Sequence, residues 1–304
     1  MTAVLPARPE TPTRGRARRV RPPVSPSVAV LSTALGLVAL LLLAFVAEVA
    51  VVGAVRHARA QTLGFATLRS ELAEGITPIG QTDSDGNVVA SGHPIALLEI
   101  PELGVREVVR QGSTSSVLAA GPGHRRDTPY PGQAGGSLIL GRQAGYGGPF
   151  AHLDDLSRGD TIVVTTGQGV QTFTVTGLRH AGDPAFALAA GESRLTLISA
   201  TGPHFLPSGT VRVDAELTST PVAAPPFVFG ASALAPAEQA MAGDRSSALA
   251  LYLWAQLLLL AGVALVWMRS VWGRWQTWVV AVPVLALAGL QVAHQFAMFL
   301  PNLL

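Results

Sequence analysis

The sequence predicts a mainly β domain with one transmembrane α-helix before it and two after it. Three long apolar runs predict the helices, and the segment between the first two contains short, evenly spaced stretches rich in Val, Ile, Leu and Thr. Many short strands at even spacing are typical of an antiparallel barrel or sandwich. The chain has no Cys, which excludes a disulfide framework, a zinc–thiolate site and a cysteine nucleophile.

The apolar runs set the expected domain order, because about 20 apolar residues are enough to cross a bilayer. The expected order is a basic, Pro-rich tail at 1–27, a transmembrane helix at 28–55, a stalk with a short helix at 56–93, the β domain at 94–217, a Pro/Ala-rich tether at 218–247, a second transmembrane helix at 248–268, a short loop at 269–277 and a third transmembrane helix at 278–300.

Basic residues favour one orientation in the membrane. All 21 basic residues are Arg, which we interpret as codon bias of a GC-rich genome. Six of them lie in the N-terminal tail, and Arg269 and Arg274 lie in the short loop, so both regions are expected in the cytoplasm. The β domain and the C-terminus are then expected outside it. A cleaved signal peptide with the site Ala58-Arg59-Ala60 is the alternative, although the first apolar run is long for a signal core.

A few polar residues interrupt the apolar runs. Gln291, His294 and Gln295 share one face of the third expected helix, and Glu48 lies near the end of the first. We expect all four near the outer interface of the membrane, where polar groups cost little; a helix–helix contact or a proton site is the alternative.

The β domain is expected to follow a short helix at 67–74 that ends at Gly75. A second short helix is expected at 150–156. The expected strands alternate apolar and polar residues, as half-buried strands do. They are 96–100, 105–109, 137–140, 161–165, 171–176, 194–199 and 210–217.

An ordered set of short motifs then resembles the sortase family over about 94–217. The set comprises Ile100-Pro-Glu-Leu-Gly-Val105, Leu118-Ala-Ala-Gly-Pro-Gly-His124, Pro131-Gly-Gln133, Gly135-Gly-Ser-Leu-Ile-Leu-Gly141, Pro149-Phe150-x-x-Leu153-x-x-Leu156, Gly159-Asp160 and Leu195-Thr-Leu-Ile-Ser199. The resemblance implies an eight-stranded, antiparallel or mixed β-barrel with short helices. It also implies the surface of a Gram-positive type of bacterium, where sortases act as cell-wall transpeptidases.

The resemblance also implies a Cys nucleophile, a His that assists it and an Arg that steadies the oxyanion, a chemistry that needs all three. Here the His position is Arg142, whose guanidinium cannot exchange a proton near neutral pH. The Cys position is Ala200, and the Arg position is Thr210 within a residue or two. Arg212 would share the face of Thr210 and could bring a positive charge to the old site.

Three other residues are candidates for the same groove. Ser199 flanks Ala200 but would face away from a groove that Ala200 faces, because side chains alternate along a strand. His204 is close in sequence and could act as a base in a rearranged site. His124 follows a glycine-rich stretch, and a structural role is expected for it.

The leading hypothesis is therefore a sortase-like pseudoenzyme at the cell membrane. Its groove would bind a sorting-signal-like peptide or a surface protein, and an arginine there favours carboxylates. A structural subunit of a membrane complex is one alternative, and a hydrolase or transpeptidase with a relocated Ser/His site is another. No cofactor, metal or nucleic-acid partner is expected.

Overall fold

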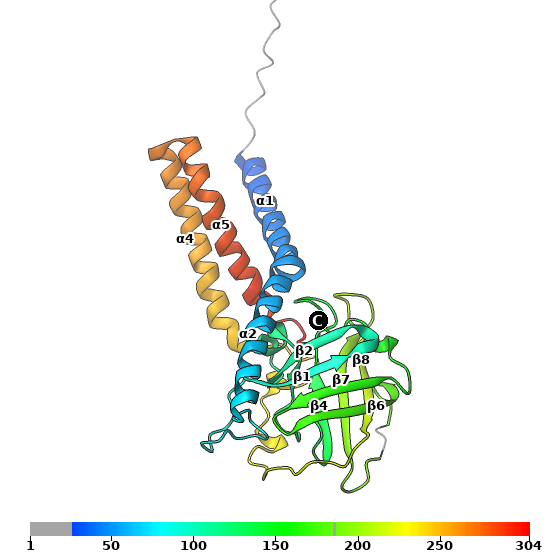
Figure 1. Ribbon diagram of the computed structural model, residues 1–304. Helices are drawn as coiled ribbons and strands as arrows, with labels where there is room; N and C mark the ends of the chain where they lie inside the picture. Colours follow the sequence, from blue (N-terminus) through cyan, green and yellow to red (C-terminus); the bar gives the residue numbers. More distant parts are fainter. Residues whose placement is uncertain (1–25, 185–186) are drawn as a thin grey trace, which may run out of the picture. The chain divides into compact units, whose positions relative to one another are not determined.

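The computed structural model describes residues 26–184 and 187–304, and the described residues divide into two units between residues 40 and 41. The basic tail expected at 1–27 lies outside the described residues except for its last two. The second unit is built on a β-barrel of eight strands (Figure 1). The strands are β1 Pro94–Ile100, β2 Val105–Gln111, β3 Gly123–His124, β4 Gly135–Leu140, β5 Thr161–Thr166, β6 Gly169–His180, β7 Ser193–Thr201 and β8 Gly209–Leu217.

The barrel is closed and mixed, which agrees with the eight-stranded barrel that the resemblance to sortases implies. Its strands follow the order β1-β2-β3-β4-β7-β8-β6-β5, and β5 returns to pair with β1. The pairs β2–β3 and β4–β7 are parallel and the others are antiparallel. Closure leaves no free sheet edge on which another chain could add a strand.

Alternation along the strands separates the core from the outer face of the barrel. On β7, Leu195 and Leu197 belong to the main core cluster, whereas Ile198 and Ala200 belong to a second cluster outside it. On β8, Val211 and Val213 point to the core in the same way. The outer face of β4, β7 and β8 is therefore the surface on which the site is built.

The first expected transmembrane helix continues much further than predicted. Helix α1 (Pro26–Ala47) passes through one π-helical stretch, η1 (Glu48–Val52), directly into α2 (Gly53–Glu74). Helix α2 includes the short helix expected at 67–74 and ends, as predicted, at Gly75 in the left-handed conformation. It does not stop earlier because its buried residues His57, Gly64 and Leu68 give it a face that packs, here against β1, β2 and α3.

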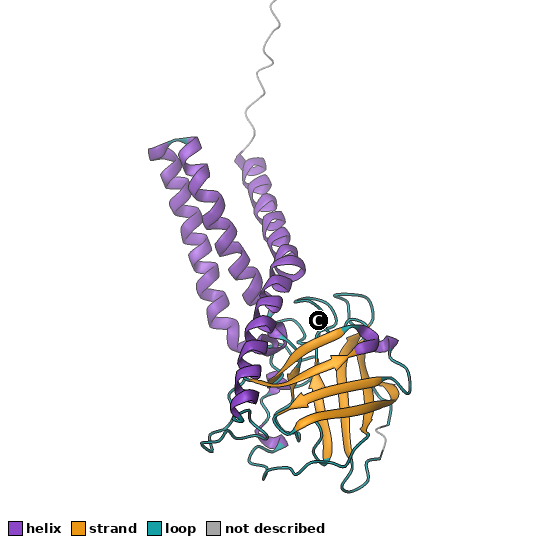
Figure 2. Cartoon of the chain, viewed as in Figure 1, coloured by secondary structure: helices purple, strands orange, loops and turns teal. Residues whose placement is uncertain are grey.

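Two further helices follow the barrel, α4 (Ala248–Trp272) and α5 (Arg274–Ala297), and they pack against each other (Figure 2). Three helical stretches are long and apolar enough to cross a membrane: Val38–Glu74, Arg245–Met268 and Trp275–Ala297. His294 of α5 contacts Glu48 of η1, with its Nδ1 2.9 Å from Glu48 Oε1 and 3.0 Å from the hydroxyl of Tyr146. Glu48 and His294, which lie on two different expected transmembrane helices, thus form a helix–helix contact.

Three short elements differ from the sequence prediction. The helix expected at 150–156 is only a 3-10 turn, η3 (Leu153–Asp155), which ends at an extended Leu156. A helix was missed, α3 (Ser115–Ala120), and so was β3, which has two residues. Segments this short carry too little periodicity to be recognised from sequence.

Candidate functional site

The site begins where β4 ends. Gly141 continues the pairing of β4 with β7 by donating its N–H to the carbonyl oxygen of Ile198, at 3.0 Å. A Cβ at this position would clash with the ring of Phe150, so the close packing requires glycine. Arg142 follows immediately, and it is one of the largest fully buried side chains, only 2% exposed.

The register of the strands brings the three sequence-predicted positions to one end of the barrel. Leu140 lies opposite Ile198 in the parallel β4–β7 pair, so Arg142 follows beside the end of β7 that carries Ala200. Ala200 pairs directly with Thr210 across the antiparallel β7–β8 pair. Arg212 lies two residues further along β8, opposite Ile198, and is half-buried.

A buried apolar cluster lies on the outer face at this end of the barrel, and a segment distant in the sequence completes it. The cluster consists of Leu118, Leu140, Ile198, Ala200 and Leu303. Leu303 is fully buried. We call the four residues that surround Leu303 the leucine pocket.

Arg142 holds the main chain of the same segment. Its Nη1 donates to the main-chain oxygen of Leu304 at 2.7 Å, and its Nη2 donates to the carbonyl oxygen of Ser115 at 3.0 Å. The guanidinium also stacks on Tyr146, 4.8 Å from the ring centroid. Burial lowers the pKa of Arg142 to about 10, so the group stays charged at neutral pH and forms charge-assisted hydrogen bonds.

The segment 301–304, which we call the C-terminal segment, has further polar contacts. The N–H of Gln143 donates to the carbonyl oxygen of Leu303 at 2.8 Å. Asn302 is fully buried, and its Nδ2 donates to the carbonyl oxygens of Ser113 and Gln239, each at 2.9 Å. Sequence reasoning gave these four residues no role, because the last expected element ended at residue 300 and a four-residue segment carries no periodic signal.

Ser199 and His204 are not brought together as a catalytic pair. Ser199 is fully buried, shares the face of Leu197, and donates its hydroxyl to the carbonyl oxygen of Phe150 at 3.2 Å. His204 lies in the loop between β7 and β8 and is exposed. A nucleophile and its base must be within hydrogen-bond reach of each other, and this arrangement does not provide that.

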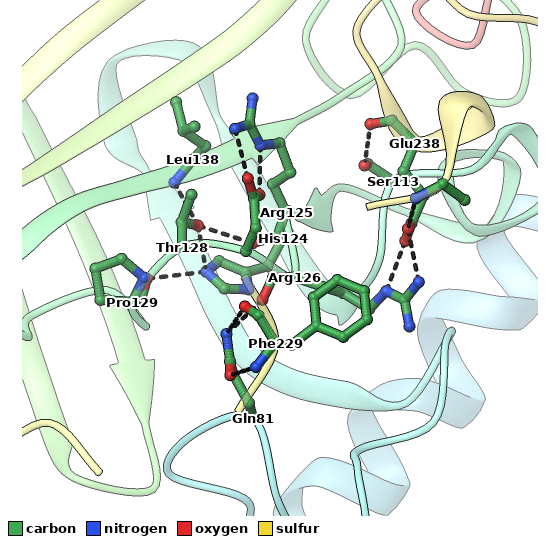
Figure 3. Close-up of polar contacts among 12 residues, drawn as sticks. Gln81, Ser113, His124, Arg125, Arg126, Thr128, Pro129, Leu138, Phe229 and Glu238 are labelled. Carbon is green, nitrogen blue, oxygen red and sulfur yellow. Dashed lines mark hydrogen bonds and ion pairs between the residues drawn. The ribbon is translucent and has the colours of Figure 1, made fainter. Parts of the chain in front are cut away.

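His124 lies in a buried polar cluster (Figure 3). Its Nδ1 is 3.0 Å from Gln111 Oε1, and its Nε2 is 2.9 Å from the carbonyl oxygen of Pro129 and 3.1 Å from the hydroxyl of Thr128. Burial lowers the pKa of His124 to about 4, against a partly opposing effect of the Pro129 carbonyl. The imidazole is therefore neutral at physiological pH and ties β3 to the loop after it.

We expect this histidine to make the fold less stable in acid. The unfolded chain binds a proton at His124 below about pH 6.5, whereas the folded chain does so only near pH 4, so the free energy of unfolding falls as the pH falls between these values. The slope contributed is at most about 1.4 kcal/mol per pH unit. Chemical denaturation from pH 7 to 4 should show a flatter slope for His124→Asn and the wild-type slope for the exposed-site control His152→Asn; equal slopes in all three would contradict the assignment.

The segment 218–247 is docked on the barrel beside this cluster. Glu238 is 1% exposed and forms a bidentate ion pair with Arg126, at 2.7 and 2.6 Å (Figure 3). The guanidinium of Arg126 also lies 4.4 Å from the ring centroid of Phe229. Gln81 accepts from the N–H groups of Val228 and Phe229. These contacts position Gln239, which in turn binds Asn302.

Residues 98–213 match the family model described as the sortase domain. Sortase E from Streptomyces avermitilis is 30% identical, over 43% of this chain and 92% of that one, with a TM-score of 0.38. The chain belongs to the sortase family. Two other similar structures are a Clostridium perfringens sortase D5 transpeptidase (21% identity, 53% and 99% covered, TM-score 0.45) and sortase E1 from Streptomyces coelicolor with a tripeptide in the active site (22%, 43% and 91%, TM-score 0.39). No curated protein matches.

This sortase-family chain combines the barrel with a site of different chemical character. Within residues 26–184 and 187–304, no cluster of three or more His, Asp or Glu side chains could hold a metal ion. The site itself offers a fixed cation, Arg142, a buried apolar cluster that includes Ala200, and main-chain hydrogen-bonding groups. Such groups can hold the main chain and one aliphatic side chain of a peptide segment.

Proposed function

We propose that this sortase-family chain is anchored in the membrane and binds a peptide segment in the groove beside Arg142 and Ala200, without acting as a cysteine transpeptidase. The observation that carries the proposal is the way the groove holds the segment 301–304. It buries a leucine side chain against Ala200 and bonds the main chain through Arg142 and Gln143.

The chemistry of the site supports binding rather than covalent catalysis. Ala200 has no nucleophilic atom, and a guanidinium cannot carry a proton from one step to the next near neutral pH. The same guanidinium is a good holder of a peptide, because it is charged, buried and oriented by Tyr146 and the carbonyl oxygen of Ser115. The side chains at Arg142 and Ala200 can contribute to affinity for a peptide, but neither can act as the nucleophile or the proton carrier that cleavage of a peptide bond needs.

The proposal places the barrel outside the cytoplasm, with the apolar helices as its anchor. Because the chain has no Cys, a single cysteine introduced at the exposed Asp85 should react with a membrane-impermeant maleimide in intact cells. A cysteine at the exposed Gln276, in the first turn of α5, should react only after the membrane is opened. The reverse pattern would contradict this orientation.

Filling the leucine pocket should weaken peptide binding. We expect a variant that lacks residues 301–304 to bind a fluorescent peptide of the sequence Phe-Leu-Pro-Asn-Leu-Leu, blocked at both ends. Adding Ala200→Trp should weaken that binding at least about tenfold, because a buried indole would occupy the volume of the leucine side chain. Ala90→Trp, at an exposed position, is the matched control. Fluorescence anisotropy in detergent measures both, and equal affinities would contradict the location of the site.

A further inference from the structure

The C-terminal segment has the position of a bound ligand within the groove. It follows α5 after a connection of only three residues, 298–300, and it places Leu303 in the pocket at Ala200. Its main chain is bonded through Arg142 and Gln143, and its Asn302 side chain reaches Ser113 and Gln239. Any peptide that uses this pocket must therefore first displace residues 301–304.

The segment leaves several buried polar groups of the site unsatisfied. Among the described residues, Nε of Arg142, Oε1 of Gln143, Oγ of Ser115 and Oδ1 of Asn302 are buried without a hydrogen-bond partner. An unsatisfied buried polar atom costs about 1–3 kcal/mol. The segment thus fits the apolar pocket well and the polar part of the site incompletely. A competing peptide that forms hydrogen bonds with these atoms would recover part of that cost. The segment can therefore be replaced by such a peptide.

The contacts also define the chemistry that the groove selects. Two main-chain carbonyl oxygens, of Ser113 and Gln239, converge on the Asn302 amide nitrogen, so the site accepts a side chain that donates hydrogen bonds. A carboxylate there would face two acceptors and be repelled. The next pocket is lined by Leu118, Leu140, Ile198 and Ala200 and accepts an aliphatic side chain. The selected pair is therefore an amide side chain followed by an aliphatic one.

We propose that residues 301–304 are a tethered, autoinhibitory occupant of the peptide groove, and that the external ligand is a peptide that forms a β-turn, as these residues do, with an amide side chain followed by an aliphatic side chain. This inference rests on the proposed function, that the groove binds a peptide. Because the segment is joined to α5, its effective concentration at the groove is on the order of millimolar. An external peptide at micromolar concentration competes poorly against it.

The test compares the full chain with two variants in detergent, using the same blocked Phe-Leu-Pro-Asn-Leu-Leu probe and fluorescence anisotropy. One variant lacks residues 301–304. The other is the full-length Asn302→Asp, which keeps the chain length and expels the segment by charge. We expect both variants to bind the probe on the order of 100-fold more tightly than the wild type. A probe with Asp in place of Asn should bind neither variant.

The outcomes separate the two proposals. If the wild type binds as tightly as the variants, the autoinhibitory role is wrong and the peptide-binding function stands. If no protein binds the probe although circular dichroism and thermal unfolding show that the variants are folded, the peptide-binding function itself is wrong and the segment is only a structural latch. If the Asp-containing probe binds as well as the Asn-containing one, the inferred selection for an amide is wrong.

Discussion

Replacing Asp214 by alanine is expected to lower the free energy of unfolding by about 3–5 kcal/mol, because it breaks a buried ion pair from one side. Asp214 of β8 is fully buried and forms a bidentate pair with Arg179 of β6, whose side chain is 9% exposed. Its Oδ1 also accepts the hydroxyl proton of Thr196 at 2.7 Å. Without the carboxylate, the guanidinium keeps its charge in a site that has lost its counter-ion.

Urea denaturation followed by circular dichroism measures this loss. The matched control is Glu99→Ala, which breaks the pair with Arg106 at the barrel surface, where the two side chains are 37% and 56% exposed. Exposed pairs contribute about 1 kcal/mol or less. If both variants lose the same stability, Asp214 does not hold the three strands β6, β7 and β8 together as its contacts imply.

Replacing Arg142 by methionine is expected to release the C-terminal segment while leaving the barrel folded. The change removes two charge-assisted hydrogen bonds, to the main-chain oxygens of Leu304 and Ser115, each contributing about 1.5–3 kcal/mol. Burial, which lowers the pKa of Arg142 to about 10, also makes the charged guanidinium costly to desolvate on folding. Methionine avoids that cost, so the free energy of unfolding of the whole protein should fall by less than the two lost hydrogen bonds alone would suggest. The local effect on the segment should therefore exceed the effect on the whole fold.

Hydrogen exchange of the Asn302 amide reports on this release, since that N–H donates to the carbonyl oxygen of Ala242 at 2.8 Å in the docked state. We expect about 10- to 100-fold faster exchange in Arg142→Met, corresponding to about 1.4–2.8 kcal/mol. Arg212→Met changes the same residue type on β8 and should leave the exchange rate unchanged. Exchange that is equally fast in both variants, or unchanged in both, would show that Arg142 is not the anchor.

Much of the fold could be predicted from the sequence, because strand alternation and turn residues are local signals. Seven of the eight strands follow from such patterns, and the resemblance to sortases supplied the closed barrel. The length of α2 could not be predicted. Its continuation past the apolar run depends on packing against strands that are distant in sequence, and its composition alone reads as a polar stalk.

The site was predictable only in part, for a physical reason. Arg142 and Ala200 follow from positions in recognisable motifs, and strand alternation explains why Ser199 faces the barrel interior. The occupant of the groove could not be foreseen. The contact between Arg142 and Leu304 joins residues 162 positions apart, and no pattern within the four-residue segment indicates a partner. The same limit applies to Glu48 and His294, which lie 246 positions apart.

The central claim is that this sortase-family groove holds a peptide and does not cut it. Mass spectrometry of the blocked peptide, incubated with an amine acceptor and the purified chain lacking residues 301–304, tests that claim most directly. We expect the peptide to be recovered intact, at its original mass, from a protein that binds it. A cleaved or amine-linked product that disappears with Arg142→Ala would contradict the claim, because it would show that the site performs catalysis without the cysteine.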